Sequence, residues 1–256
     1  MRALLAFTKK ELMQQLRSGR LMILCIIFAL LGIMNPATAK LTPWLLEMMS
    51  ESLAESGMTV TSVTVDAMAS WTQFFKNIPI ALIAFVLLES NIFTKEYQSG
   101  TLVPILTKGL DRYKVVISKT AVLTVIYSAG YWLCFAITYA YNAYFWDNGV
   151  AHNLVFSVIC LWLLGLWVVM LTVLFSAAAS SNTAVLVGTG GVFFAAYLVG
   201  LVPRVKEYSP TMLMNTAPLL VGAEKISVYY SAVIITAVLC AVFVAVSIPI
   251  MNKRRL

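Results

Sequence analysis

Residues 154–178 read LVFSVICLWLLGLWVVMLTVLFSAA, without a single charged side chain. A helix needs about 20 consecutive, mostly apolar residues to cross the hydrocarbon core of a bilayer. This stretch is long enough, and it is apolar on every side, whereas a helix on the surface of a soluble domain is apolar along one stripe. It therefore predicts a transmembrane helix.

Five other mostly apolar stretches meet or approach this length, and the second in the chain is the shortest. They comprise residues 21–37, 74–88, 120–141, 183–202 and 228–251. Over the whole chain, 61% of the residues are hydrophobic and only 11% are charged. A soluble domain carries about a quarter charged residues. We therefore predict an all-α integral membrane protein with six transmembrane helices, in which residues 1–256 form one transmembrane domain.

The basic residues indicate the orientation of these six helices. Most of the 18 lysines and arginines precede the first helix, follow the second or follow the last, and six crossings place these segments on one side. Acidic residues such as Glu47, Asp147 and Glu207 lie on the other side. Because loops rich in Lys and Arg stay in the cytoplasm, both termini are predicted to be cytoplasmic. Topology thus accounts for the net charge of +7, and no nucleic-acid partner is expected.

Residues 1–20 precede the first predicted span and contain a helical stripe of leucines. Leu5, Leu12 and Leu16 share one face, and basic and amide side chains occupy the others. This pattern predicts an amphipathic helix in the cytoplasmic interface of the membrane. The alternative is a simple basic anchor.

Residues 203–226, between the last two spans, are apolar in the middle but interrupted by Pro210, Pro218 and Gly222. The segment is too short and too broken to cross the bilayer. Irregular backbone at membrane depth is tolerated where protein or water covers it. We therefore predict short re-entrant helices at the outer face, with a plain surface loop as the alternative.

A search for chemistry finds no catalytic motif, no phosphate-binding loop of the GxxxxGK[ST] type, and no cysteine or histidine spacing typical of a metal site. No catalytic, cofactor-binding or metal-binding residues are therefore predicted. Charges near the membrane are few. Lys76 and Glu89 lie at opposite ends of the second span, where each can reach an interface by extending its side chain. The glycines of the sequence Gly188-Thr189-Gly190-Gly191 are expected to allow close helix packing.

The loop over residues 94–119 carries the strongest local signal. It begins after Phe93 and reads TKEYQSGTLVPILTKGLDRYKVVISK, with charges on either side of a short apolar patch at Leu102, Val103, Ile105 and Leu106. A groove on a partner can receive such a patch, while the charged rim sets its orientation. The alternative is a segment that rests on the lipid surface.

This loop resembles the first cytoplasmic loop of the type-two permease family of ABC transporters. That family's pattern is a glutamate, three residues, Gly-Thr-Leu, a leucine-rich turn, an arginine, and a lysine at the start of the next span. The matching residues are Glu96, Gly100, Thr101, Leu102, Arg112 and Lys119. Gly109 stands where the family often has a proline before the arginine. The likeness extends over the whole chain, including the six spans and the two non-spanning segments.

The resemblance implies a permease subunit of an ATP-driven exporter in the inner membrane of a bacterial cell. ATP and Mg²⁺ would bind to separate P-loop ATPase subunits, and this chain would pair with a second copy or a sister permease. Coupling to the ATPase would involve Glu96, Gly100, Thr101, Leu102 and Arg112. The apolar spans suggest an amphipathic peptide or a hydrophobic antibiotic as cargo, contacted by the second and fifth spans. An ion-coupled secondary transporter or a channel is the alternative.

Overall fold

A computed structural model describes residues 2–55, 65–107 and 109–254, and the regular structure in these ranges is helical. Six of the helices described there are long and apolar enough to cross a bilayer. They are α2 (Arg20–Glu55), α3 (Ala67–Glu89), α6 (Arg112–Phe145), α7 (Leu154–Ala178), α8 (Asn182–Gly200) and α10 (Tyr230–Lys253). The predicted fold class is confirmed.

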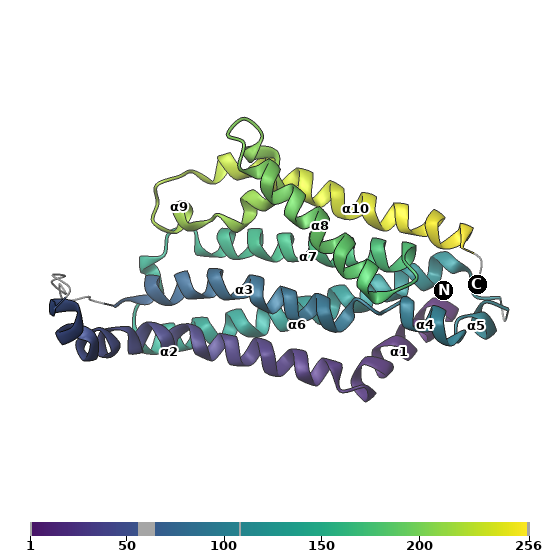
Figure 1. The fold of residues 1–256 in the computed structure, drawn as a ribbon, viewed down its shortest axis with the longest axis horizontal. Helices are drawn as coiled ribbons and strands as arrows, with labels where there is room; N and C mark the ends of the chain where they lie inside the picture. The colour runs from purple at the N-terminus through teal and green to yellow at the C-terminus, as the bar shows by residue number, and fades with distance from the viewer. Residues whose placement is uncertain (1, 56–64, 108, 255–256) are drawn as a thin grey trace.

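The six helices run along the long axis of the molecule (Figure 1). Helices α2, α3 and α6 pack against one another, and α7 packs against α6, α8 and α10. We call the end that holds α1 (Arg2–Arg17) and the last turn of α10 the terminal end. The opposite end, which holds α9 (Ala217–Leu220), is the far end.

Helix α2 continues well beyond the predicted end of the first span, through Pro36 and Pro43. A proline inside a helix cannot donate to the carbonyl four residues earlier. For Pro36 that carbonyl belongs to Gly32, and the hydroxyl of Thr138 on α6 donates to it instead, at 3.1 Å. Asn35 adds a 3.0 Å bond from its Nδ2 to the same hydroxyl. The carbonyl of Gly32, which Pro36 leaves without a donor in α2, therefore has a hydrogen-bond partner on α6.

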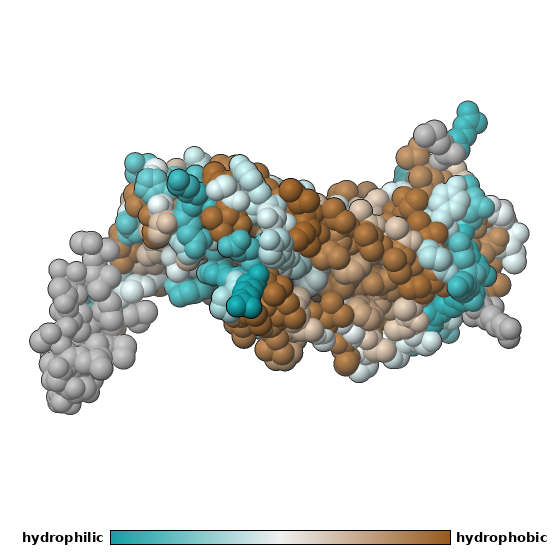
Figure 2. Space-filling model, turned by 90° about the horizontal axis from the view of Figure 1, so that it is seen from above, coloured by the Kyte–Doolittle hydropathy of each residue, from teal (hydrophilic) through white to brown (hydrophobic). Residues whose placement is uncertain are grey.

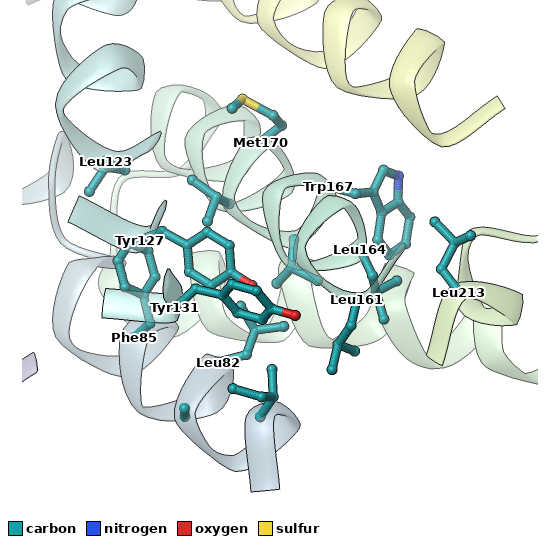
Figure 3. Close-up of a cluster of buried hydrophobic side chains, with 14 of the residues drawn as sticks. Leu82, Phe85, Leu123, Tyr127, Tyr131, Leu161, Leu164, Trp167, Met170 and Leu213 are labelled. Carbon is teal, nitrogen blue, oxygen red and sulfur yellow. The ribbon is translucent and has the colours of Figure 1, made fainter. Parts of the chain in front are cut away.

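The core of the bundle lies between α3, α6 and α7 and is rich in aromatic side chains (Figure 3). Tyr127 and Tyr131 of α6 are fully buried there, and the Tyr131 hydroxyl donates to the carbonyl of Val158 at 2.7 Å. Tyr127 lies against Gly165 of α7, where a Cβ atom would come within 1.8 Å of the tyrosine hydroxyl. Glycine at this position therefore permits the close contact between α6 and α7.

The surface has the distribution expected for a membrane protein. On the face shown in Figure 2, hydrophobic residues cover the middle of the molecule and hydrophilic residues lie on either side toward the ends. Within the most apolar window of each helix, 67% of the α7 residues are buried, but only 11% of those in α8 and in α10. Helix α7 is therefore the central helix, whereas α8 and α10 present most of their surface to the surroundings.

The two non-spanning segments form short helices. Helix α1 turns Phe7, Glu11 and Gln15 toward the bundle and leaves the leucine stripe exposed. At the far end, the segment of residues 203–226 forms η2 (Lys206–Tyr208), η3 (Pro210–Met214) and α9 before η4 (Ile226–Tyr229). Leu213 and Leu219 are buried, and η3 and α9 pack against α7, which argues against a plain surface loop. The depth of both segments in a bilayer stays a prediction.

Candidate coupling site

The loop between α3 and α6 lies at the terminal end and folds into two short helices, α4 (Thr94–Ser99) and α5 (Val103–Thr107). Gly100 ends α4 with φ of 64°, in the left-handed region that favours glycine. Gly100 separates α4, of which Thr94 and Glu96 are buried, from α5, of which Val103 and Thr107 are exposed.

Glu96 of α4 binds the loop to two other helices. Its Oε1 lies 3.1 Å from Nζ of Lys10, and its Oε2 lies 3.0 Å from Nζ of Lys119. Lys119 also donates a 2.7 Å hydrogen bond to Oε2 of Glu11, and Oε1 of Glu11 accepts from Lys10 at 2.8 Å. Two carboxylates and two ammonium groups thus alternate in a closed ring that joins α1, α4 and α6. We call these four residues the charge ring.

Three of the four residues of the charge ring are almost fully buried, while the side chain of Lys10 is 42% exposed. Lys119 is 1% exposed, Glu11 4% and Glu96 6%, so these charges have lost most of their hydration. A buried charge costs several kcal/mol unless opposite charges compensate it, and here the four formal charges sum to zero. Burial lowers the pKa of Lys10, but the hydrogen bond to Glu11 and the charge of Glu96 outweigh it and leave the pKa raised. The ring is therefore stable only while all three helices stay in contact.

A second polar contact lies beside the ring. Nε2 of Gln15 on α1 donates a 2.6 Å hydrogen bond to Oε2 of Glu89, at the end of α3. Nη1 of Arg20 lies 3.9 Å from the same oxygen and donates to Oδ1 of Asn91 at 2.8 Å. Glu89 is fully buried, so the expectation that it extends to an interface is wrong. The reason is that α1 covers it and supplies its partner.

Arg112 connects the other end of the loop to α10. Its Nη1 donates to the backbone carbonyls of Met251, Asn252 and Arg254, at 3.0, 2.9 and 2.6 Å. Carbonyls in the last turn of a helix lack partners within the helix, and an arginine side chain can satisfy them. Arg112 thus caps the end of α10.

Arg254, which follows α10, contacts the same loop from the C-terminal segment. Its guanidinium lies 3.9 Å from the ring centroid of Tyr97 on α4, in a cation–π contact. It also donates to the carbonyl of Ala177 and to the hydroxyl of Ser180, between α7 and α8, at 2.9 and 2.8 Å. The loop is therefore bonded to the ends of α7 and α10 as well as to α1 and α6.

The motif residues divide into a buried group and an exposed group. Glu96 and Leu102 are buried, while Gly100, Thr101 and Val103 are exposed. The expectation that Leu102 belongs to an exposed apolar patch is wrong, because its side chain turns into the bundle. Leu106 is half-buried, and the side chain of Ile105 lies outside the described residues. The exposed apolar surface of the described loop is centred on Val103.

Sequence reasoning missed the residues through which α1 joins this site. Glu11 is the only acidic residue among residues 1–46, in an otherwise basic segment. It shares one helical face with Phe7 and Gln15, four residues away on either side. A lone acid on the same helix face as Phe7 and Gln15, in an otherwise basic segment, is the signal that could have revealed the ring.

An apolar crevice lies between α3, α7 and α8, which include the second and fifth spans. Its volume is ≈ 280 Å³. The lining residues are Pro79, Leu82, Ile83, Val86, Leu87, Val168, Leu186, Thr189, Gly190 and Phe193. Gly188 packs tightly, since a Cβ there would lie 2.5 Å from the ring of Phe175, as predicted for this glycine. Gly190 and Gly191 instead face open space, so for them the packing prediction is wrong.

A family model described as ABC-2 family transporter protein matches residues 5–256. The chain belongs to this family. It is therefore a transmembrane permease subunit of an ABC transporter, and the ATPase resides on separate subunits with which it works. No curated protein matches the chain significantly.

Proposed function

We propose that this ABC-2 permease is half of the membrane channel of an exporter in the inner membrane of a bacterial cell. Its terminal end faces the cytoplasm, and it pairs there with P-loop ATPase subunits and laterally with a second copy or a sister permease. The basic residues that flank the spans support this orientation. ATP and Mg²⁺ bind to the ATPase subunits, because this chain contains no phosphate-binding loop motif.

The charge ring is the observation that carries the proposal. It bonds the loop to α1 and α6, while Arg112 bonds it to α10. The exposed side of the same loop presents Gly100, Thr101 and Val103 to a partner. A force on that side therefore acts on several helices together. ATP can drive transport because closure of the ATPase subunits favours one arrangement of these helices over another.

Val103 offers a direct test of docking. It is 42% exposed on α5, and Val150, at the far end of the molecule, is also 42% exposed. The chain would be purified in detergent with its ATPase subunits, as wild type, Val103→Asp or Val150→Asp. A buried, unpaired carboxylate in the docking groove is costly, so Val103→Asp should release the ATPase and Val150→Asp should retain it. Equal retention by both variants would overturn the proposed docking surface.

The apolar lining of the crevice supports a proposal about the chemistry of the cargo. We propose an amphipathic peptide or a hydrophobic antibiotic, because the crevice between the second and fifth spans is lined almost wholly by apolar groups. In proteoliposomes that contain the complex, ATP should drive outward transport of such a compound, and a proton gradient should not. Transport by the chain alone, driven by a proton gradient, would instead support a secondary transporter.

A further inference from the structure

Lys76 of α3 is exposed and makes no ion pair, hydrogen bond or ring contact with the described residues. At a rise of 1.5 Å per residue, it lies about 14 Å along the helix from Ala67 and about 20 Å from Glu89. Lys76 therefore lies in the half of α3 nearer the far end, two residues inside the apolar run that begins at residue 74. An ionisable residue inside a transmembrane span is rare and commonly marks a binding site or a transport path.

Lys76 lies on the same side of α3 as the apolar crevice. Pro79, Ile83 and Leu87, which line the crevice, follow Lys76 by three, seven and eleven residues and therefore share its helix face. The crevice begins one turn from the lysine and extends away from it along α3. A positive charge thus stands at one end of a long apolar groove.

Thr189 of α8 supplies a second polar group in the crevice. It is 1% exposed, and its hydroxyl has no hydrogen-bond partner. Two other buried threonines of the spans, Thr172 and Thr236, donate to the carbonyl four residues earlier, at 2.9 and 2.6 Å, whereas Thr120 of α6 also lacks a partner among the described residues. A buried hydroxyl without a partner costs free energy, which an occupant with a polar atom at this depth would recover.

We propose that Lys76 and the crevice form one binding site for an elongated amphiphile with a single anionic end group, such as a carboxylate. The end group pairs with Lys76, the apolar body lies along α3 toward Leu87 over about 17 Å, and a polar atom of the body meets Thr189. This inference rests on the proposed function and specifies the chemistry of the cargo. The volume of ≈ 280 Å³ suits one narrow chain rather than a two-chain phospholipid, since pockets for drug-sized ligands begin at about 300 Å³.

The apolar part of the site can be tested with two glycines. A side chain at Gly190 or at Gly191 meets nothing within 4 Å, but only Gly190 lines the crevice. The probe is a fatty acid with a photoreactive diazirine in its chain, added to the purified full-length chain in detergent. Gly190→Leu should abolish most of the crosslinking to α3 and α8, and Gly191→Leu should retain it. Equal crosslinking in both variants would overturn the site.

The charged part is tested with the same probe and its neutral primary amide. Lys76→Gln should weaken binding of the fatty acid about tenfold, the value of a charge-assisted hydrogen bond, and leave the amide unchanged. Lys76→Arg should preserve the preference for the acid, as should Lys225→Gln, which removes another exposed lysine. The same preference in Lys76→Gln as in wild type would show that Lys76 only extends to the interface, and would overturn the assignment.

A third experiment distinguishes a site for cargo from a site for bilayer lipid. In nanodiscs, raising the fraction of phosphatidylglycerol should leave crosslinking of the fatty acid unchanged. Displacement of the probe in proportion to that fraction would overturn the cargo assignment in favour of an ordinary lipid site. None of these arms uses ATP or an ATPase subunit. Their failure is therefore distinguishable from failure of the Val103→Asp experiment, which tests the proposed function.

Discussion

Removing Lys119 is the sharpest test of the charge ring. Lys119 contacts Glu11 at 2.7 Å and Glu96 at 3.0 Å. At an effective dielectric constant of about 20, each contact contributes roughly 5–6 kcal/mol of Coulomb attraction. Desolvation of the buried ions offsets most of that gain, so the intact ring adds little net stability. In Lys119→Met the carboxylates of Glu11 and Glu96 stay buried and still carry their desolvation penalty, but Lys10 is the one cation of the ring that remains to compensate them. We expect a loss of about 3–5 kcal/mol in the free energy of unfolding.

The assay is unfolding of the full-length chain in mixed micelles, titrated with a denaturing detergent and followed by circular dichroism. Lys114→Met is the matched control, because Lys114 pairs with Asp111 near the surface and such pairs are worth about 0–1 kcal/mol. Adding Glu96→Gln to Lys119→Met removes one of the uncompensated carboxylates and should recover at least about 1 kcal/mol. A loss in Lys119→Met no larger than in the control, or strictly additive losses in the double variant, would refute the reasoning.

Three further predictions concern other contacts. Gly165→Ala should cost about 1–3 kcal/mol through overpacking against the hydroxyl and the ring of Tyr127, and a loss within error in the same titration would contradict the steric explanation. Arg112→Gln removes the cap of α10, so amide hydrogen exchange in the last turn of α10 should accelerate, and unchanged exchange would show that the cap is dispensable. Asn35→Ala should cost about 0.6–1.7 kcal/mol, because it removes the hydrogen bond that Thr138 accepts and the acceptor for the side-chain amide of Asn77; a loss within error would exclude a stabilising role for this buried amide.

Sequence alone predicts the six spans because crossing a bilayer is a local property of about 20 apolar residues. The boundaries that it misses are those where a helix continues beyond an uninterrupted apolar run into a segment of mixed polarity. Helix α3 begins at Ala67, before the apolar run at residue 74, because the carboxylate of Asp66 accepts hydrogen bonds from the backbone of Met68 and Ala69. Helix α2 reaches Glu55 through two prolines. Both extensions mix apolar with polar residues, so the length of an apolar run does not show where these helices begin or end.

The candidate site likewise has a part that the sequence predicts and a part that only the structure shows. The motif from Glu96 to Lys119 can be recognised in the sequence, and with the six spans it indicates an ABC-2 permease. The sequence does not reveal that Leu102 points inward, because an apolar residue in a loop suits either a core or a partner.

The six membrane-spanning helices were thus determined by the sequence itself, through runs of apolar residues whose solvent is lipid. Only the tertiary structure decided that Glu11 lies beside Lys119, 108 positions along the chain, and that Lys10 lies beside Glu96. The physical reason is that the energy of a buried charge depends on which opposite charge the fold brings within about 3 Å of it. A linear pattern of lysines and glutamates records the charges, and the packing of α1 against α4 and α6 pairs them.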